Sequence, residues 1–217
     1  MKIYDCFLDD KNRFAIGDST LGEMIASSGK IHLWEQRAGE RIDTVVIHYM
    51  SAVGVASDRP YDLSLLLKIL CDYGVSSHYL INRRGKVLRL VPEEKKAWHC
   101  GPSIMPHPDN RTGVNEFSIG IELAATEASG FTNSQYNALC KLCIDIERRR
   151  CMELCYVGHD QIAGERAVAQ GLRSMSKTDP GPLFDWEFFQ EEMSKYRAYW
   201  QEKCRKIMQN AECKMQK

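Results

Sequence analysis

The chain has 217 residues and carries 29 basic and 29 acidic side chains, so its formal net charge is zero. This balance creates no long-range field that would favour nucleic acid or an anionic membrane as a partner. Its 44% hydrophobic and 27% charged residues are ordinary for a globular chain with one sizeable core. No apolar run approaches the roughly 20 residues that span a bilayer. We therefore expect no nucleic-acid partner and no insertion into a membrane.

The N-terminus and the cysteines both bear on where the protein works. Residues 1–14 carry six charged side chains where a secretory signal needs an apolar stretch, so the sequence predicts no such signal. The nine cysteines are an odd number, and without a signal they are expected to be reduced thiols. The sequence therefore predicts a cytoplasmic protein.

The first half of the chain contains a strand, a helix and a hairpin. Residues 1–40 have no strong periodicity and are interpreted as an N-terminal extension. The continuous apolar run at 44–47 predicts a strand that is buried on both faces. Four leucines at i, i+3, i+4 and i+7 predict a helix over 60–74, and its last residue, a glycine, suits a left-handed cap. The segments 78–81 and 86–91 are typical of two strands of a hairpin.

The second half begins with a loop, because residues 100–115 hold glycine, proline, aspartate and asparagine. Alternation over 117–123 predicts a strand whose apolar side chains share one face. Thr132 and Gln135 form a capping-box pattern that begins a helix reaching about Arg150. A short strand is expected at 155–157. The tail has apolar side chains at helical spacing and should dock as an amphipathic helix.

Strands that alternate with helices in this way predict an α/β fold, a central mixed sheet flanked by helices. We divide the chain into the extension at 1–40, one domain at 41–188 and a C-terminal helix at 189–217.

Three side chains that suit a metal ion follow apolar elements or lie in a turn. His48 and His159 each come directly after a predicted strand, and Asp179 lies in a turn rich in proline and glycine. Two imidazoles and one carboxylate, with a fourth position open to water, are what a hydrolytic zinc site needs. Alone, a histidine at a strand end is more often a structural residue, and aspartate before proline is commonly a turn former.

Six sequence motifs in order resemble a known family. They cover residues 40–188 and read Asp43-Thr-Val-Val-Ile-His48-Tyr, Ser77-His78-Tyr-Leu-Ile, Ala97-Trp98-His99-Cys-Gly101, Asn115-Glu-Phe-Ser-Ile-Gly-Ile-Glu122-Leu, Gly158-His159-Asp-Gln-Ile-Ala and Lys177-Thr-Asp179-Pro-Gly-Pro-Leu-Phe-Asp-Trp186. This set resembles the type 2 N-acetylmuramoyl-L-alanine amidases, zinc enzymes whose superfamily includes phage lysins and the peptidoglycan recognition proteins. It is most similar to the cytoplasmic, AmpD-type branch that recycles cell wall.

The resemblance implies an enzyme that hydrolyses the amide between (anhydro)N-acetylmuramic acid and L-alanine in muropeptides or peptidoglycan. It implies that His48, His159 and Asp179 bind one Zn²⁺, and that Glu122 is the general base. It also implies that Lys177 stabilises the oxyanion. The strand pattern agrees for Glu122, the one carboxylate on the non-core face of its strand. The structural alternatives are a glutamate in a surface salt bridge and a solvated lysine.

The same motifs supply candidate substrate-binding residues. Trp98 and His99 begin the loop that runs to Asn115, and this loop is interpreted as one wall of a substrate groove. Tyr49 follows the first metal ligand, and His78 faces either the site or a backbone partner. A buried tryptophan and a hydrogen-bonded histidine would explain Trp98 and His99 equally well.

Two departures from the family pattern and three alternatives complete the sequence interpretation. The segment 164–176 is longer than in the family pattern, so the assignments of Lys177 and Asp179 would be wrong if this segment moved their turn. The residues after His48 also differ from the commonest version of the motif, which bears on substrate preference. The cysteines at 140, 143, 151 and 155 permit a four-thiolate zinc site, although packing explains the first pair better. A non-catalytic peptidoglycan-binding module and a phage-type lysin acting on intact wall are the other two.

Overall fold

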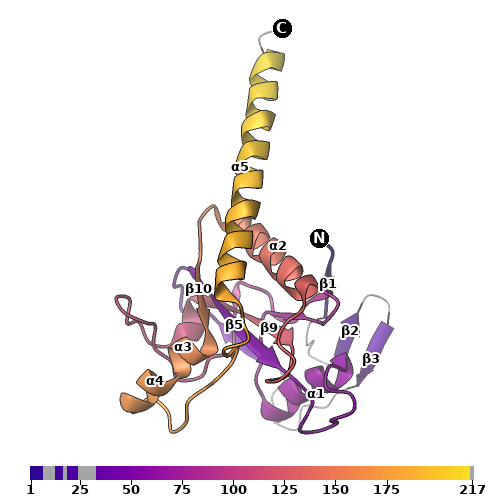
Figure 1. The fold of residues 1–217 in the computed structure, drawn as a ribbon, viewed down its shortest axis with the longest axis vertical. Helices are drawn as coiled ribbons and strands as arrows, with labels where there is room; N and C mark the ends of the chain where they lie inside the picture. Colours follow the sequence, from indigo (N-terminus) through magenta and orange to yellow (C-terminus); the bar gives the residue numbers. More distant parts are fainter. Residues whose placement is uncertain (7–12, 17–18, 24–32, 216–217) are drawn as a thin grey trace.

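The computed structural model of the protein describes residues 1–6, 13–16, 19–23 and 33–215. Its centre is a six-stranded sheet with helices on both faces (Figure 1). In spatial order the strands are β1 (Ile3–Asp5), β7 (Val87–Arg89), β6 (Tyr79–Ile81), β9 (Ser118–Ala124), β5 (Thr44–Met50) and β10 (Cys155–Gly158). Strands β6, β9, β5 and β10 run parallel to one another, whereas β7 is antiparallel to β6. The predicted α/β fold with a mixed sheet is confirmed.

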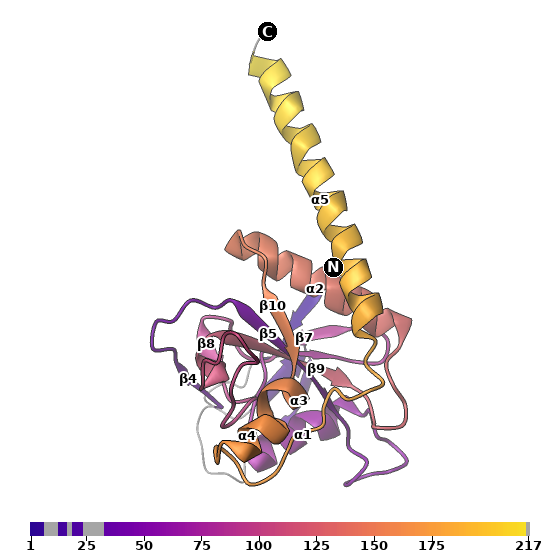
Figure 2. The same ribbon diagram turned by 60° about the vertical axis from the view of Figure 1, so that its left-hand side comes forward.

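The helices form two layers around this sheet. The helices are α1 (Leu63–Tyr73), the 3-10 turn η1 (Val114–Glu116), α2 (Asn133–Arg150), α3 (His159–Ala163), α4 (Glu165–Ala169) and α5 (Trp186–Met215). Figure 2 shows α2 and α5 on one side of the sheet and α1, α3 and α4 on the other. Two small pairs lie outside the main sheet, β2 (Arg13–Ile16) with β3 (Ser19–Glu23) and β4 (Trp34–Gln36) with β8 (Lys95–Ala97).

Alternation along the central strands decides which side chains meet which layer. Val45 and Ile47 of β5 lie in the core beneath α2, as do the odd-numbered apolar residues of β9. The even-numbered residues therefore face the α1 and α3 side. In the register of the two strands His48 lies opposite Glu122, so both side chains emerge on that second face.

The two long helices that the sequence predicts begin and end as their caps indicate. Asp62 caps α1, and Gly74 ends it in the left-handed conformation with φ 62°. Thr132 and Gln135 form a complete capping box at the start of α2. Such a cap stabilises a helix by about 1 kcal/mol. The predicted start of the first helix at residue 60 is wrong, because Asp62 caps a helix that begins at Leu63, whereas α2 begins after Thr132 as predicted.

The predicted extension at 1–40 contributes to the sheets where it is described. Strand β1 adds to the edge of the main sheet beside β7, and β4 pairs with β8. The Arg37 guanidinium donates to the backbone carbonyls of Asn115, Glu116 and Ser118 at 2.8 Å each. This side chain ties the N-terminal segment to the start of β9. Residues 7–12, 17–18 and 24–32 of the extension lie outside the described residues.

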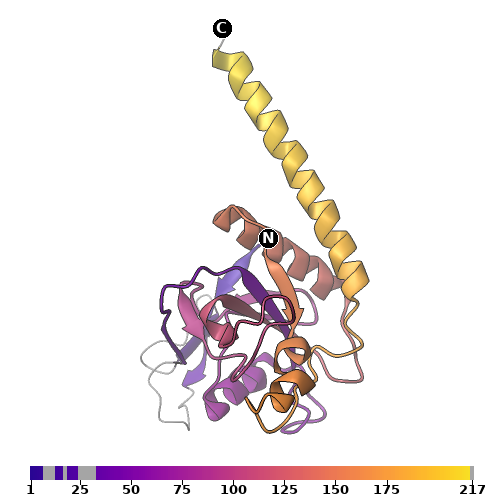
Figure 3. The same cartoon turned by 90° about the vertical axis from the view of Figure 1, so that its left-hand side faces the viewer.

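The C-terminal helix α5 docks through its first half. Phe189 and Met193 are buried in the core against α2, and Trp200 packs at its margin. Beyond this point the helix leaves the body of the molecule (Figures 1 and 3). Within the described ranges, every helix is too short or too polar to cross a membrane.

Candidate functional site

Three side chains from distant parts of the chain converge at the carboxyl ends of β5 and β10. His48 Nδ1 lies 3.1 Å from Asp179 Oδ2, and His159 Nδ1 lies 3.1 Å from Asp179 Oδ1. One ligand atom from each residue lies within 4.8 Å of the others. The backbone N–H of Asp160 donates to the carbonyl of Asp179 at 2.7 Å, which holds the loop of Asp179 against α3. The structure thus brings together all three predicted metal ligands.

The environment of His48 favours its neutral form, which is the form that binds a metal. His48 and His159 are 1% and 4% exposed. Burial, helped by the neighbouring His159, lowers the pKa of His48 to about 4 despite the hydrogen bond to Asp179. Burial opposes ionisation of Asp179, but hydrogen bonds to His159 and His48 outweigh it and hold the pKa of that carboxyl below its ordinary value.

This donor set fits Zn²⁺. Two imidazole nitrogens and one carboxylate oxygen on one side of a pocket leave a coordination position open, as a hydrolytic zinc site requires. Among the described residues a second group, His48, His99 and Cys100, also lies close enough to hold a metal ion. Neither group includes any of the four cysteines considered for a structural zinc site. Two of these, Cys140 and Cys143 of α2, are buried in the core between α2 and the sheet.

Glu122 lies on β9, directly across from His48. Its Oε2 is shielded from solvent and accepts no hydrogen bond from the described residues. Burial, followed by the negative charge of Asp179, raises the pKa of Glu122 well above its ordinary value, while Lys177 acts in the opposite direction. A carboxylate without a partner beside a metal-binding set has the properties of a general base.

The long segment between His159 and Asp179 folds without displacing the ligands. Residues 165–169 form the short helix α4, and the chain then returns so that Lys177 N donates to the carbonyl of Ala163 at 2.9 Å. Lys177 is exposed and lines the same pocket as the ligands and Glu122.

The pocket has a volume of about 550 Å³ and lies above the ligand set. It is lined by His48, His159, Asp179, Glu122 and Lys177, and by four of the five predicted substrate-binding residues, Tyr49, Trp98, His99 and Asn115. The sequence interpretation did not assign the six further lining residues to the site; they are Leu70, Val75, Ser76, Cys100, Gly101 and Arg173. Arg173 lies in the long segment between His159 and Asp179. Its position in sequence between two metal ligands was the signal that could have indicated a place in the pocket.

The structure places His78 outside this pocket, fully buried behind β9. Its Nδ1 accepts from the backbone N–H of Gly120 at 2.9 Å, and its Nε2 lies 3.1 Å from the carbonyl of Lys95. The side-chain oxygen of Asn115 accepts from the backbone N–H groups of His99 and Cys100. His78 therefore has the backbone partners that the sequence left as its alternative, and Asn115 holds the wall of the pocket.

Comparison with known proteins identifies the family. The sequence pattern of the N-acetylmuramoyl-L-alanine amidases (Amidase_2) matches residues 38–182. The chain belongs to this amidase family. All three converging ligands, Glu122 and Lys177 lie inside the matched region.

Individual relatives agree with this assignment. The chain is 38% identical over 128 residues to the 1,6-anhydro-N-acetylmuramyl-L-alanine amidase AmpD of Escherichia coli, covering 56% of this chain and 60% of that relative. It thus spans less than two thirds of the relative's length. A crystal structure of a selenomethionine derivative of AmpD superimposes with a TM-score of 0.57 at 29% identity, covering 74% of this chain and 89% of that one.

A second amidase structure carries a bound ligand. It is the complex of the E. coli amidase AmiD with anhydro-N-acetylmuramic acid-L-Ala-D-gamma-Glu-L-Lys. This structure superimposes with a TM-score of 0.54 at 28% identity and covers 84% of this chain and 66% of that one.

Proposed function

We propose that the protein is a zinc-dependent amidase that hydrolyses the bond between N-acetylmuramic acid and L-alanine. The observation that carries this proposal is that His48 Nδ1 and His159 Nδ1 each lie 3.1–3.2 Å from an oxygen of the Asp179 carboxylate. These atoms lie beside Glu122 in a pocket of a chain that belongs to the amidase family.

The position of each polar side chain in the pocket suits it to one step of amide hydrolysis. Zn²⁺, when bound, lowers the pKa of water to about 7 and polarises a carbonyl group. Glu122 takes the proton from the attacking water, because its Oε2 has no partner among the described residues and its raised pKa makes it a stronger proton acceptor. Glu122 then delivers this proton to the departing L-alanine amine. Lys177 places an ammonium group at the pocket, where it stabilises the developing oxyanion.

We propose soluble anhydro-muropeptides as the preferred substrates. The relative AmpD is named for the 1,6-anhydro sugar, and the ligand of AmiD contains the same sugar with a γ-linked glutamate. A γ-linked glutamate keeps its α-carboxylate free, so such a ligand is anionic. Arg173 and Lys177 both line the pocket and supply two cations for an anionic stem peptide. A cytoplasmic location fits such a substrate and stays a prediction.

Product analysis tests this function. The zinc-loaded protein is incubated with soluble anhydro-muropeptide and separately with intact sacculi, and the products are identified by mass spectrometry. We expect free anhydro-N-acetylmuramic acid and a peptide beginning with L-alanine, released faster from the soluble substrate. Faster release from sacculi would favour the phage-type lysin, and binding without release would favour a non-catalytic module.

The metal requirement is tested with a ligand variant. His48→Ala removes one of two imidazoles, so we expect it to lose tight zinc binding, measured by metal analysis after dialysis against a weak chelator. Stoichiometric zinc in this variant would refute the ligand set.

A further inference from the structure

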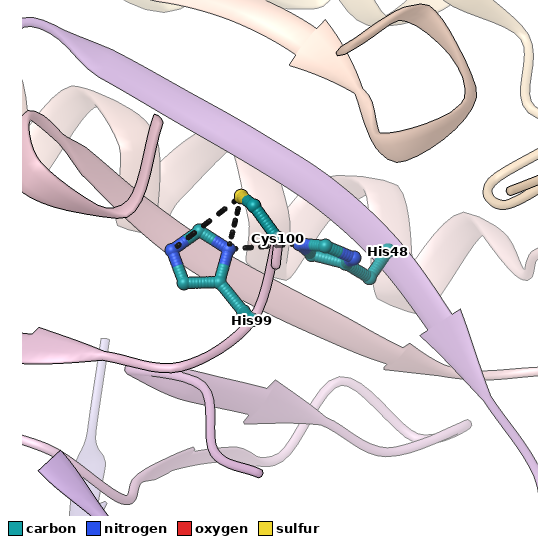
Figure 4. A group of neighbouring side chains, drawn as sticks. All are labelled: His48, His99 and Cys100. Carbon is teal, nitrogen blue, oxygen red and sulfur yellow. Dashed lines mark hydrogen bonds between the residues drawn. The ribbon is translucent and has the colours of Figure 1, made fainter. Parts of the chain in front are cut away.

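A chain of buried hydrogen bonds leads from His48 away from the metal position. His48 Nε2 lies 3.0 Å from His99 Nδ1 (Figure 4). On the other side of the ring, His99 Nε2 lies 3.3 Å from the hydroxyl of Ser118, and this hydroxyl lies 2.6 Å from the carbonyl of Val114. All three side chains are buried.

The carbonyl of Val114, at the end of this series of hydrogen bonds, determines where each proton in the series lies. A backbone carbonyl only accepts hydrogen bonds, so the Ser118 hydroxyl must donate to Val114. The Ser118 oxygen then accepts from His99 Nε2–H. A neutral imidazole carries a single N–H, so His99 Nδ1 is left as an acceptor. When a metal ion takes the place of the proton between His48 Nδ1 and Asp179, His48 Nε2 is then the donor to His99, and the lone pair of His48 Nδ1 is free for the metal.

The second imidazole follows the same rule by a shorter route. His159 Nε2 lies 3.1 Å from the backbone carbonyl of Cys100, which also only accepts. With a metal ion bound, His159 therefore holds its proton on Nε2 and presents the lone pair of Nδ1 to the metal. A backbone carbonyl thus determines which nitrogen of each imidazole faces the metal without a proton. The carbonyl of Cys100 acts on His159 directly, and that of Val114 acts on His48 through two side chains.

The position of the His99 ring is enforced by its surroundings. Its backbone N–H is held by Asn115 Oδ1, and the ring lies against Gly120 of β9. A Cβ atom at Gly120 would lie 2.5 Å from the ring, so only glycine leaves room for it there. The ring of His99 stands nearly perpendicular to that of His48, at 87°, so its edge meets His48 Nε2.

We propose that His99 is a positioning residue that, with Ser118, holds His48 in the tautomer able to bind the metal. This inference rests on the proposed function, because it takes His48 as a zinc ligand. Partners that orient a ligating histidine typically change metal affinity 10–100-fold when they are removed. In this assignment the ring acts through His48, not through the substrate.

Zinc affinity, measured by competition with a chromogenic chelator, tests the proposal. We expect His99→Leu to weaken zinc binding by about 10–100-fold. His99→Gln, whose amide carbonyl accepts from His48 and whose NH₂ donates to Ser118, should recover most of this loss. Ser118→Ala should weaken binding by a smaller factor, because the His99 ring remains. Unchanged affinity in both His99→Leu and Ser118→Ala would overturn the proposal.

A matched serine provides the control. Ser77 is also fully buried and donates its hydroxyl to a backbone carbonyl, that of Tyr79, but it has no contact with the imidazole chain. Ser77→Ala should leave zinc affinity unchanged. If Ser77→Ala and Ser118→Ala weakened binding equally, the effect would be one of general packing and the proposal would fail.

Nitrogen-15 spectra of the histidine rings give a second readout that does not depend on stability. In the zinc-loaded protein we expect His99 as the neutral Nε2–H tautomer. An Nδ1–H tautomer would overturn the proposal, because that nitrogen could not accept from His48.

The nearby thiol provides a competing explanation that the same titration detects. Cys100 Sγ lies 3.1 Å from His99 Nδ1 (Figure 4). A second equivalent of zinc that binds the protein and is lost in Cys100→Ser would make His99 a metal ligand and overturn the positioning role. Wild-type protein that binds no zinc would instead refute the proposed function, so the two failures are distinct.

Discussion

Two glutamates, Glu93 and Glu122, show how the surroundings can shift the pKa of the same residue type in opposite directions. Glu93 follows β7 and receives hydrogen bonds from Tyr79, Arg149 and Arg150 at 2.6–3.0 Å. Burial would raise the pKa of Glu93, but the hydrogen bonds, led by that from Arg149, lower it to about 2. Glu122 has an oxygen with no partner, and burial raises its pKa.

This difference separates a structural carboxylate from a reactive one. Glu93 is committed to three donors and has no capacity left to accept a proton near neutral pH. Glu122 keeps an unsatisfied oxygen at the metal-binding pocket, an arrangement that costs stability and leaves a proton acceptor available. The comparison predicts that removing Glu122 affects chemistry and that removing Glu93 affects folding.

The largest expected effect is that of Glu122→Gln on turnover. The amide cannot take a proton, so we expect hydrolysis of anhydro-muropeptide to fall at least about 100–1,000-fold. Zinc content should be retained, and the free energy of unfolding should stay equal or rise, because a shielded carboxylate oxygen without a partner among the described residues is removed. Steady-state kinetics and urea unfolding measure both. Turnover near the wild-type rate would assign the proton transfer to another group.

Glu93→Gln should show the reverse pattern, with turnover kept and stability lost. The folded-state pKa of about 2 lies below the ordinary value of 4.5, so the contribution of Glu93 is fully present above pH 4.5. It is lost as the pH falls toward 2. The shift corresponds to stabilisation on the order of 3 kcal/mol.

Urea unfolding of both proteins between pH 7 and pH 2 measures this contribution. The wild type should be more stable than Glu93→Gln at pH 7, and the difference should shrink steadily below pH 4.5. A difference that does not change with pH would mean that the carboxylate charge is not what stabilises the wild type.

The same comparison explains how much the sequence could predict. His48 and His159 could be found because each directly follows a run of apolar strand residues, and Glu122 because it is the one carboxylate on the non-core face of the alternating segment 117–123. Because β5 and β9 are parallel and in register, His48 and Glu122 meet without any contact that the local sequence encodes.

Other features depend on partners that no local pattern encodes. The backbone partners of His78 belong to Gly120 and Lys95, so spacing could not place its ring behind the pocket. Strand β1 has three residues and pairs with residues 84 positions away, Ile3 with Val87, which is too short for a periodic pattern. Helix α4, with five residues, is equally short.

The smallest expected effect in this set comes from Lys177, the cation that acts on Glu122. Its positive charge lowers the pKa of Glu122, so in Lys177→Met that pKa should rise further. In the proposed mechanism hydrolysis requires ionised Glu122, so the decline of the rate on acidification should begin at a higher pH than in the wild type. Loss of oxyanion stabilisation should also lower kcat by about tenfold or more.

Two companion variants give this prediction its controls. Lys177→Arg keeps the charge and should restore the acid limb of the pH profile. Arg173→Met removes the other cation of the pocket, which does not act on Glu122, and should raise KM without moving that limb. An acid limb that stays in place in Lys177→Met would show that Lys177 does not control the protonation of Glu122. Burial and the charge of Asp179 would then account for the pKa of Glu122, in contrast to Glu93, whose pKa is lowered by its hydrogen bonds to arginines.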